Sequence, residues 1–208
     1  MEEKMKESWW TAGFGALIFL LLHAAAAYAE IQPPEVGRTT KFKCSGPYGE
    51  NLTFTISEIN GGVARIELDR DGKAEWREKP VNAFGLTVFK RKQRNDGKGV
   101  RKQSLDDDVL ARYAKLEPGS EFTFDVGERH DEGKWRWGYK VKVGQPETIS
   151  HDLLGEIEVI SVSEKRKVWK GSYSSKMNVL LYPKGGMSVA WTYKDSKGTQ
   201  ECKLVGAN

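Results

Sequence analysis

The fold is decided most clearly by one stretch, Trp135-Arg136-Trp137-Gly138-Tyr139-Lys140-Val141-Lys142-Val143. Aromatic and aliphatic residues occupy every second position of it, and three cationic residues fall between them. Successive side chains of a β-strand point to opposite faces of a sheet, so this alternation predicts a strand with one buried and one solvated face. The same pattern recurs along much of the chain, which favours an antiparallel, mainly β fold.

Further strands are predicted on both sides of this stretch. Turn signals such as Asn60-Gly61-Gly62, Asp71-Gly72 and Gly185-Gly186 separate them, and Gly144 is expected to end the 135–143 strand. We expect antiparallel meanders that form a sandwich or a curved open barrel. The predicted strands cover 52–57, 64–69, 75–78, 85–89, 122–126, 157–162, 167–173, 177–182, 188–193 and a closing strand at Cys202 and Leu204.

One segment has helical periodicity instead. Leu105, Val109, Tyr113 and Leu116 recur at the spacing of one helix face, and Ser104 can cap the start. The sequence therefore predicts one short helix near residues 105–116.

The first 29 residues differ from the rest. Residues 9–29 are almost wholly apolar and end in Ala27-Tyr28-Ala29, a small-x-small cleavage pattern. Residues 1–8 carry three glutamates against two lysines, whereas a signal peptide is usually positive there, and about 21 apolar residues can also span a bilayer. We predict a signal helix at 1–29, either removed or retained as a membrane anchor, and a periplasmic or extracellular location for the remainder.

The chain of 208 residues is long enough for one domain or two small ones. Residues 30–37, which contain Pro33-Pro34, are predicted as a linker, and 38–208 as a single β domain. Similar spacings around Trp76-Pro80 and Tyr182-Pro183 leave open a pair of related β units over 39–100 and 117–204.

The two cysteines, Cys44 and Cys202, lie near the ends of the exported part. An isolated pair in an oxidising compartment is most simply a disulfide. The alternative, a redox or metal pair, would favour a Cys-x-x-Cys spacing that the sequence lacks.

A basic run is the sharpest candidate site. Without residues 1–29 the net charge is +5, from 31 Lys and Arg against 26 Asp and Glu, and much of it is concentrated here. Outside the cytoplasm such a run suits an anionic envelope polymer, a lipid head group or another envelope protein rather than nucleic acid. The alternative is a solvated hairpin tip. The run comprises Lys90, Arg91, Lys92, Arg94, Lys98, Arg101 and Lys102.

Trp135, Trp137 and Tyr139 form a second candidate site. Aromatic faces stack on sugars and lipids, so the three residues could line a binding groove, although the core face of a sheet needs the same residues.

No catalytic, metal or cofactor site is predicted. The sequence has no Gly-x-Ser-x-Gly elbow, and the adjacent residues Ser150-His151-Asp152 cannot easily bring their side chains together. The acidic groups at Asp69-Arg70-Asp71-Gly72 and Asp106–Asp108 are typical of a hairpin turn and a helix start.

Four motifs carry a resemblance: Pro118-Gly119 before Phe122, Trp135-x-Trp137-x-Tyr139-x-Val141, Leu154-Gly155-Glu156-Ile157, and Tyr182-Pro183-x-x-Gly186. Over residues 116–193 the chain resembles uncharacterised exported all-β proteins of proteobacteria. The third motif replaces the usual turn of that pattern, and the fourth departs from it by one spacing. The resemblance implies a bacterial, envelope-located β protein and supplies no activity.

These observations favour an exported envelope protein that acts as a non-enzymatic binding or structural module. The alternative is a carrier of a hydrophobic or glycan ligand inside a curved sheet, and a hydrolase is less favoured. Membrane contact is expected only through residues 9–29, where these are retained.

Overall fold

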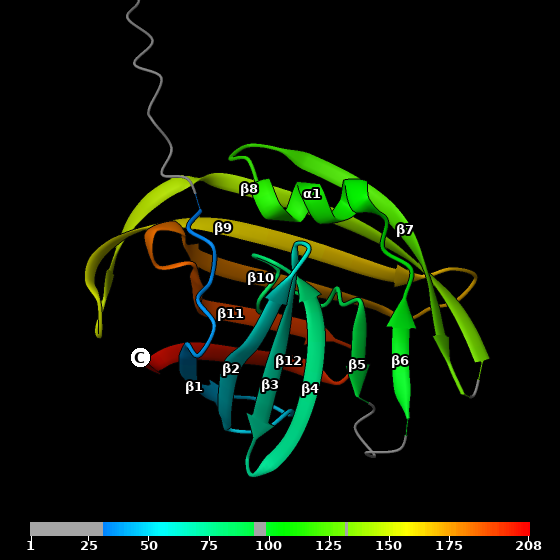
Figure 1. The fold of residues 1–208 in the computed structure, drawn as a ribbon, viewed down its shortest axis with the longest axis horizontal. Helices are drawn as coiled ribbons and strands as arrows, with labels where there is room; N and C mark the ends of the chain where they lie inside the picture. Colours follow the sequence, from blue (N-terminus) through cyan, green and yellow to red (C-terminus); the bar gives the residue numbers. More distant parts are fainter. Residues whose placement is uncertain (1–30, 94–98, 132) are drawn as a thin grey trace, which may run out of the picture.

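The computed structural model describes residues 31–93, 99–131 and 133–208 (Figure 1). These residues form a closed antiparallel barrel in which each strand pairs with its neighbour in sequence and β1 pairs with β12. The strands are β1 (Thr39–Ser45), β2 (Asn51–Asn60), β3 (Val63–Arg70), β4 (Lys73–Pro80), β5 (Arg91–Gln93), β6 (Val100–Gln103), β7 (Glu121–His130), β8 (Gly133–His151), β9 (Gly155–Val168), β10 (Ser174–Tyr182), β11 (Met187–Asp195) and β12 (Gly198–Ala207).

Closure corrects the predicted architecture. The prediction of a mainly β antiparallel fold is confirmed, but the sheet is neither a sandwich nor an open barrel. The last strand returns beside the first, from Thr40 opposite Ala207 to Ser45 opposite Glu201. Closing a sheet satisfies the backbone groups that an edge strand would expose. Alternation within single strands does not report that long-range pairing, so the sequence left closure undecided.

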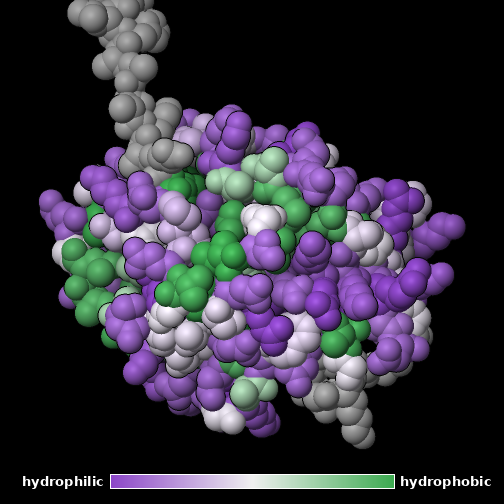
Figure 2. Space-filling model, viewed as in Figure 1, coloured by the Kyte–Doolittle hydropathy of each residue, from purple (hydrophilic) through white to green (hydrophobic). Residues whose placement is uncertain are grey.

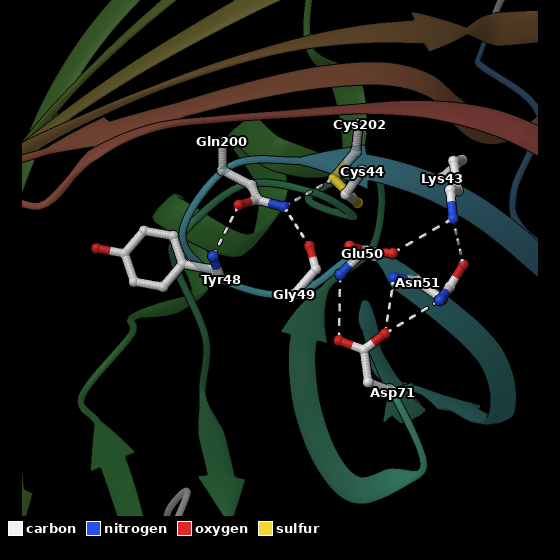
Figure 3. The surroundings of a disulfide bond; sticks show 9 residues. All are labelled: Lys43, Cys44, Tyr48, Gly49, Glu50, Asn51, Asp71, Gln200 and Cys202. Carbon is white, nitrogen blue, oxygen red and sulfur yellow. Dashed lines mark hydrogen bonds and ion pairs between the residues drawn. A yellow bond between two sulfur atoms is a disulfide. The ribbon is translucent and has the colours of Figure 1, made fainter.

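The expected disulfide lies on this seam. Cys44 and Cys202 are direct partners across β1 and β12, with Cα atoms 4.1 Å apart and a sequence separation of 158 positions. Gln200 fixes the loop after β1, because its side chain accepts from the Tyr48 N–H (2.9 Å) and donates to the Gly49 carbonyl (2.7 Å) (Figure 3). Disulfide and loop together hold the two ends of the sheet in one register.

Inward side chains form the core of the barrel. In β8 the alternation holds, since Trp137, Tyr139, Val141 and Val143 are buried while Lys140 and Lys142 are exposed. The Tyr139 ring stacks on Phe124 of β7, with ring centroids 4.8 Å apart. Figure 2 shows the outside of one face, where hydrophilic residues surround smaller apolar patches.

The helix forms as predicted but is shorter. α1 spans Asp107–Lys115, and its cap is the Asp106 carboxylate, which accepts from the Val109 N–H at 2.9 Å. Ser104 was the wrong cap because its hydroxyl instead donates to the Gly127 carbonyl. α1 lies beside β7 and β8 (Figure 1) and buries Tyr113, whose ring meets Phe122 edge-on.

The prediction of a strand at 85–89 is wrong. Residues 81–90 make turns and bends, and they contact the inward side chains of several strands, so they cross the barrel interior. The Thr87 and Phe89 N–H groups bond to the side chains of Glu164 and Gln103 instead of to a strand. Buried side chains on both sides of this segment, including Leu86 and Val88, explain why it resembles a strand in sequence.

Two further boundaries differ from expectation. β8 continues through Gly144, where the register with β9 shifts between Val143 and Pro146, so the predicted turn is a bulge. β9 runs without a break from 155 to 168, and residues 169–172 turn into β10, so no strand spans 167–173. Both expectations relied on local turn formers, which a long, bent strand accommodates.

The chain reaches the barrel at the β10–β11 end. The Gln32 N–H donates to the Pro183 carbonyl at 2.9 Å, and the Arg38 guanidinium donates to the Gly185 carbonyl. The described part of the predicted linker is therefore packed against the barrel. The predicted signal helix at 1–29 lies outside the described residues, and no helix within them has the length and apolarity needed to cross a membrane.

Candidate anion-binding site

A row of cations lies on the inner wall of β4, β5 and β6. Lys92 is the direct cross-strand partner of Arg77 on one side and of Arg101 on the other. Like charges in direct opposition normally destabilise a sheet. Three cations in adjacent inward positions are therefore an arrangement that needs compensation from elsewhere.

Two members of the row, Arg77 and Lys92, border a cavity of about 220 Å³ inside the barrel. Apolar side chains such as Leu52, Phe54 and Met177 form one part of its wall, and Tyr193 and Gln200 add polar atoms. No carboxylate of the described residues lines the cavity. Five cationic side chains do: Arg70, Arg77, Lys79, Lys92 and Arg166.

Arg166 reaches the cavity from β9. Its guanidinium lies 4.4 Å from the centre of the Trp137 ring and 5.7 Å from that of Tyr173, which fixes its plane against the aromatic wall. Its Nε atom is buried without a hydrogen-bond partner among the described residues. Arg166 therefore retains unused donor capacity inside the barrel.

Carboxylates compensate only part of this charge. Glu75 contacts Arg77 at 2.5 Å and Arg70 at 4.0 Å, and Glu128 pairs with Arg101. Within the described parts of the chain, neither Lys92 nor Arg166 has a carboxylate within ion-pair distance. The centre of the cation row thus lacks a counter-ion.

A third buried carboxylate, Glu164, is committed to the crossing segment. It accepts from the Thr87 N–H at 2.7 Å, from the Thr87 hydroxyl and from the Tyr113 hydroxyl at 3.0 Å. These bonds anchor residues 81–90 and α1 to β9. Glu164 therefore holds the wall of the cavity in place.

The electrostatic cost of placing these cations together appears as lowered pKa values of two lysines. Burial lowers the pKa of Lys92 well below its ordinary value, and the charges of Arg77, Arg101 and Arg166 lower it further. Burial likewise lowers the pKa of Lys79 to about 7. An anion in the cavity would oppose these effects, because a nearby negative charge favours the protonated form.

The structure divides the basic run between two faces of the barrel. Lys92 and Arg101 point inward, whereas Lys90, Arg91 and Lys102 are exposed. Arg94 and Lys98 lie outside the described residues. Alternation along β5 and β6 separates residues that are adjacent in sequence, so the described members do not form a single surface patch.

The aromatic candidates are also divided. Trp137 and Tyr139 belong to the core, and the Tyr139 hydroxyl accepts from Gln103 at 2.9 Å. Trp135 is 49% exposed near the tip of the β7–β8 hairpin, where its ring stacks on His130. The three residues therefore do not line one groove.

Sequence reasoning missed Arg70, Arg77, Lys79 and Arg166 as site residues. A usable signal was present, because Arg70 continues the inward set of Ile66 and Leu68 along the same strand. A charged residue at an inward position of a predicted strand requires a partner or a function.

Comparison with known proteins supports the fold. No protein-family model and no curated protein sequence matches the chain. Among solved structures, the hypothetical lipoprotein YmcC from Escherichia coli K12 matches with a TM-score of 0.52 and 9% identity, over 85% of this chain and 89% of that chain. A lipoprotein candidate from Parabacteroides distasonis has a TM-score of 0.43 and 10% identity, over 86% and 99% of the two chains, which is too low for any argument. The chain therefore shares the YmcC fold, and no sequence family is shown.

Proposed function

We propose that the chain is an exported, non-enzymatic binding protein whose barrel holds the anionic group of a small ligand. Lys92 carries this proposal, because it lies at the centre of an inward cation row without a carboxylate partner among the described residues. Burying an uncompensated charge is costly, and such a charge is tolerated where an anion completes the site.

The cavity sets the class of ligand. A volume of about 220 Å³ is smaller than the roughly 300–1,000 Å³ of typical small-molecule pockets. The cations suit a phosphate or carboxylate group, and Leu52, Phe54 and Met177 suit a short apolar body. The expected ligand is therefore a small amphipathic anion and not a long lipid chain. This proposal modifies the alternative given above, a carrier of a hydrophobic or glycan ligand.

Three observations support an exported location. The apolar segment and cleavage pattern of residues 9–29 are typical of export. Disulfides persist mainly in oxidising compartments, and both cysteines of the sequence form one. The similarly folded YmcC is described as a lipoprotein. In this chain both Cys44 and Cys202 lie in the disulfide, so neither is a free thiol.

The test is thermal unfolding of the full chain with and without inorganic phosphate, at constant ionic strength. Lys92→Met keeps much of the side-chain length and removes the charge, while Lys102→Met removes an exposed lysine from the neighbouring strand. Wild type and K102M should be stabilised by phosphate, by about 2.7 kcal/mol at one hundred times the dissociation constant. K92M should be more stable than wild type without phosphate and should not respond to it.

An equal phosphate response in wild type and K92M would refute the proposal. Native mass spectrometry of the purified wild-type chain then identifies a bound ligand by its mass. A retained species should be anionic and should be lost from K92M but kept by K102M.

A further inference from the structure

The outer wall of the barrel carries a second, separate row of cations. The row consists of one lysine from each of four neighbouring strands: Lys140 on β8, Lys165 on β9, Lys176 on β10 and Lys194 on β11. Each lysine is the direct cross-strand partner of the next. All four side chains are exposed. Neighbouring strands are about 4.8 Å apart, so the lysines form a dense line of charge around the barrel.

This line keeps most of its charge. Glu121 contacts Lys140 and also holds Lys142 at 2.6 Å. The other three lysines of the row have no carboxylate within ion-pair distance in the described parts of the chain. Because like charges in direct opposition destabilise a sheet, the row favours a binding role over a stabilising one.

The shape beside the row is concave. An open depression of about 850 Å³ is bordered by all four lysines and by Lys167. Ser172, Ser174 and Ser196 also line it and add short polar side chains. Asp195 is the one carboxylate among the described lining residues, and it accepts from the hydroxyls of Tyr48 and Tyr193. The lysine ammonium groups therefore surround a hollow that can admit anionic groups.

An exposed tryptophan lies on the same side of the wall. Trp169 follows β9 and is 52% exposed. The backbone N–H of Trp169 donates to the Arg136 carbonyl at 2.8 Å, and the outward Arg136 guanidinium lies 4.4 Å from the centre of the Trp169 ring. These contacts hold the indole on the outer side of β8, two positions along the same strand face from Gly138 at the edge of the depression.

We infer that this wall is a docking surface for a bilayer that contains anionic phospholipids. Lysine rows attract anionic head groups, and tryptophan is enriched at membrane–water interfaces because its ring is apolar with one polar N–H. The exposed indole favours a lipid surface over a soluble polyanion, which would need the charges alone. This inference does not depend on the cavity inside the barrel.

The test compares binding of the full chain to vesicles of pure phosphatidylcholine and to vesicles that also contain phosphatidylglycerol. Residues 9–29 contain no Asp, Glu, Lys or Arg, and residues 1–8 carry two lysines against three glutamates. Every variant shares these residues, so a difference between variants reports on the barrel. Wild type should bind the anionic vesicles more tightly. The double variant Lys165→Gln/Lys176→Gln should lose about 25-fold of that affinity, at about five-fold for each lysine.

The matched control is Lys184→Gln/Lys203→Gln, which removes two exposed lysines away from the row. It should bind anionic vesicles like wild type, and an equal loss in both double variants would overturn the inference. Brominated anionic lipids should quench wild-type fluorescence more than that of Trp169→Phe. Equal quenching, together with K165/K176-dependent binding to soluble polyphosphate, would assign the wall to a soluble polyanion and overturn it as well.

Discussion

Replacing Lys79 by methionine should stabilise the protein at neutral pH and lose that advantage at alkaline pH. Lys79 of β4 is 3% exposed, and its ammonium donates to the Leu86 carbonyl. Its pKa falls from 10.5 to about 7, chiefly because of burial and then because of the Arg77 charge, while Glu164 opposes the change in part. Since one pKa unit corresponds to about 1.4 kcal/mol, this fall costs the folded state about 5 kcal/mol at and below pH 7.

The sign of the pH dependence of the free energy of unfolding follows from proton binding at Lys79. Between pH 7 and 10.5 the unfolded chain binds more protons at Lys79 than the folded chain, so this residue makes the free energy of unfolding rise with pH. The variant K79M lacks this dependence but leaves the Leu86 carbonyl without its donor, at about 1–3 kcal/mol. The variant should therefore gain about 2–4 kcal/mol at pH 7 and nothing at pH 9.5.

The assay is urea unfolding of wild type and K79M at the two pH values. Lys73→Met provides the control, because Lys73 lies exposed on the same strand. That variant should differ from wild type by the same small amount at both pH values. If the difference between K79M and wild type were also independent of pH, the assignment of a buried, weakly basic Lys79 would be rejected.

Two further predictions concern the disulfide and the cap of α1. Replacing Cys44 and Cys202 together by alanine should lower the free energy of unfolding by about 5 kcal/mol, because the disulfide restricts the chain entropy of a 158-residue loop in the unfolded state. Chemical denaturation measures this loss. A loss below about 1 kcal/mol would contradict the assignment of the stabilisation to chain entropy. Asp106→Ala should cost about 1 kcal/mol because the Val109 N–H loses its cap, whereas Asp107→Ala, without a cap bond, should cost less. Equal losses from the two aspartates would show that general helix charge, and not the cap, is responsible.

Much of the barrel follows from local patterns. The strands around Phe54, Ile66, Val141 and Val189 were predicted because one face of each is buried and the other is solvated, so the period of two is visible in the sequence. Residues 85–89 resemble a strand in sequence because adjacent side chains such as Val88 and Phe89 are both buried in the crossing segment. Its backbone bonds go to Glu164 and Gln103, and those long-range partners leave no local signal.

The candidate site was less accessible to prediction. The basic run includes Lys92 and Arg101, but their convergence with Arg77 requires the register of β4, β5 and β6. The outer lysine row was missed for the same reason. Successive members are 25 positions or fewer apart along the chain, yet only the pairing of four strands places them in line.

The seam between β1 and β12 can close only after the whole barrel sequence has been made. β1 is the first strand of the barrel to be made and its final partner is the last, so β1 keeps one side unpaired until residues 198–207 arrive. Contacts of such long sequence separation form slowly, and an unpaired edge in the meantime can recruit strands from other chains. Completion of the barrel favours the pairing of Cys44 with Cys202, because β12 then holds the two Cα atoms 4.1 Å apart.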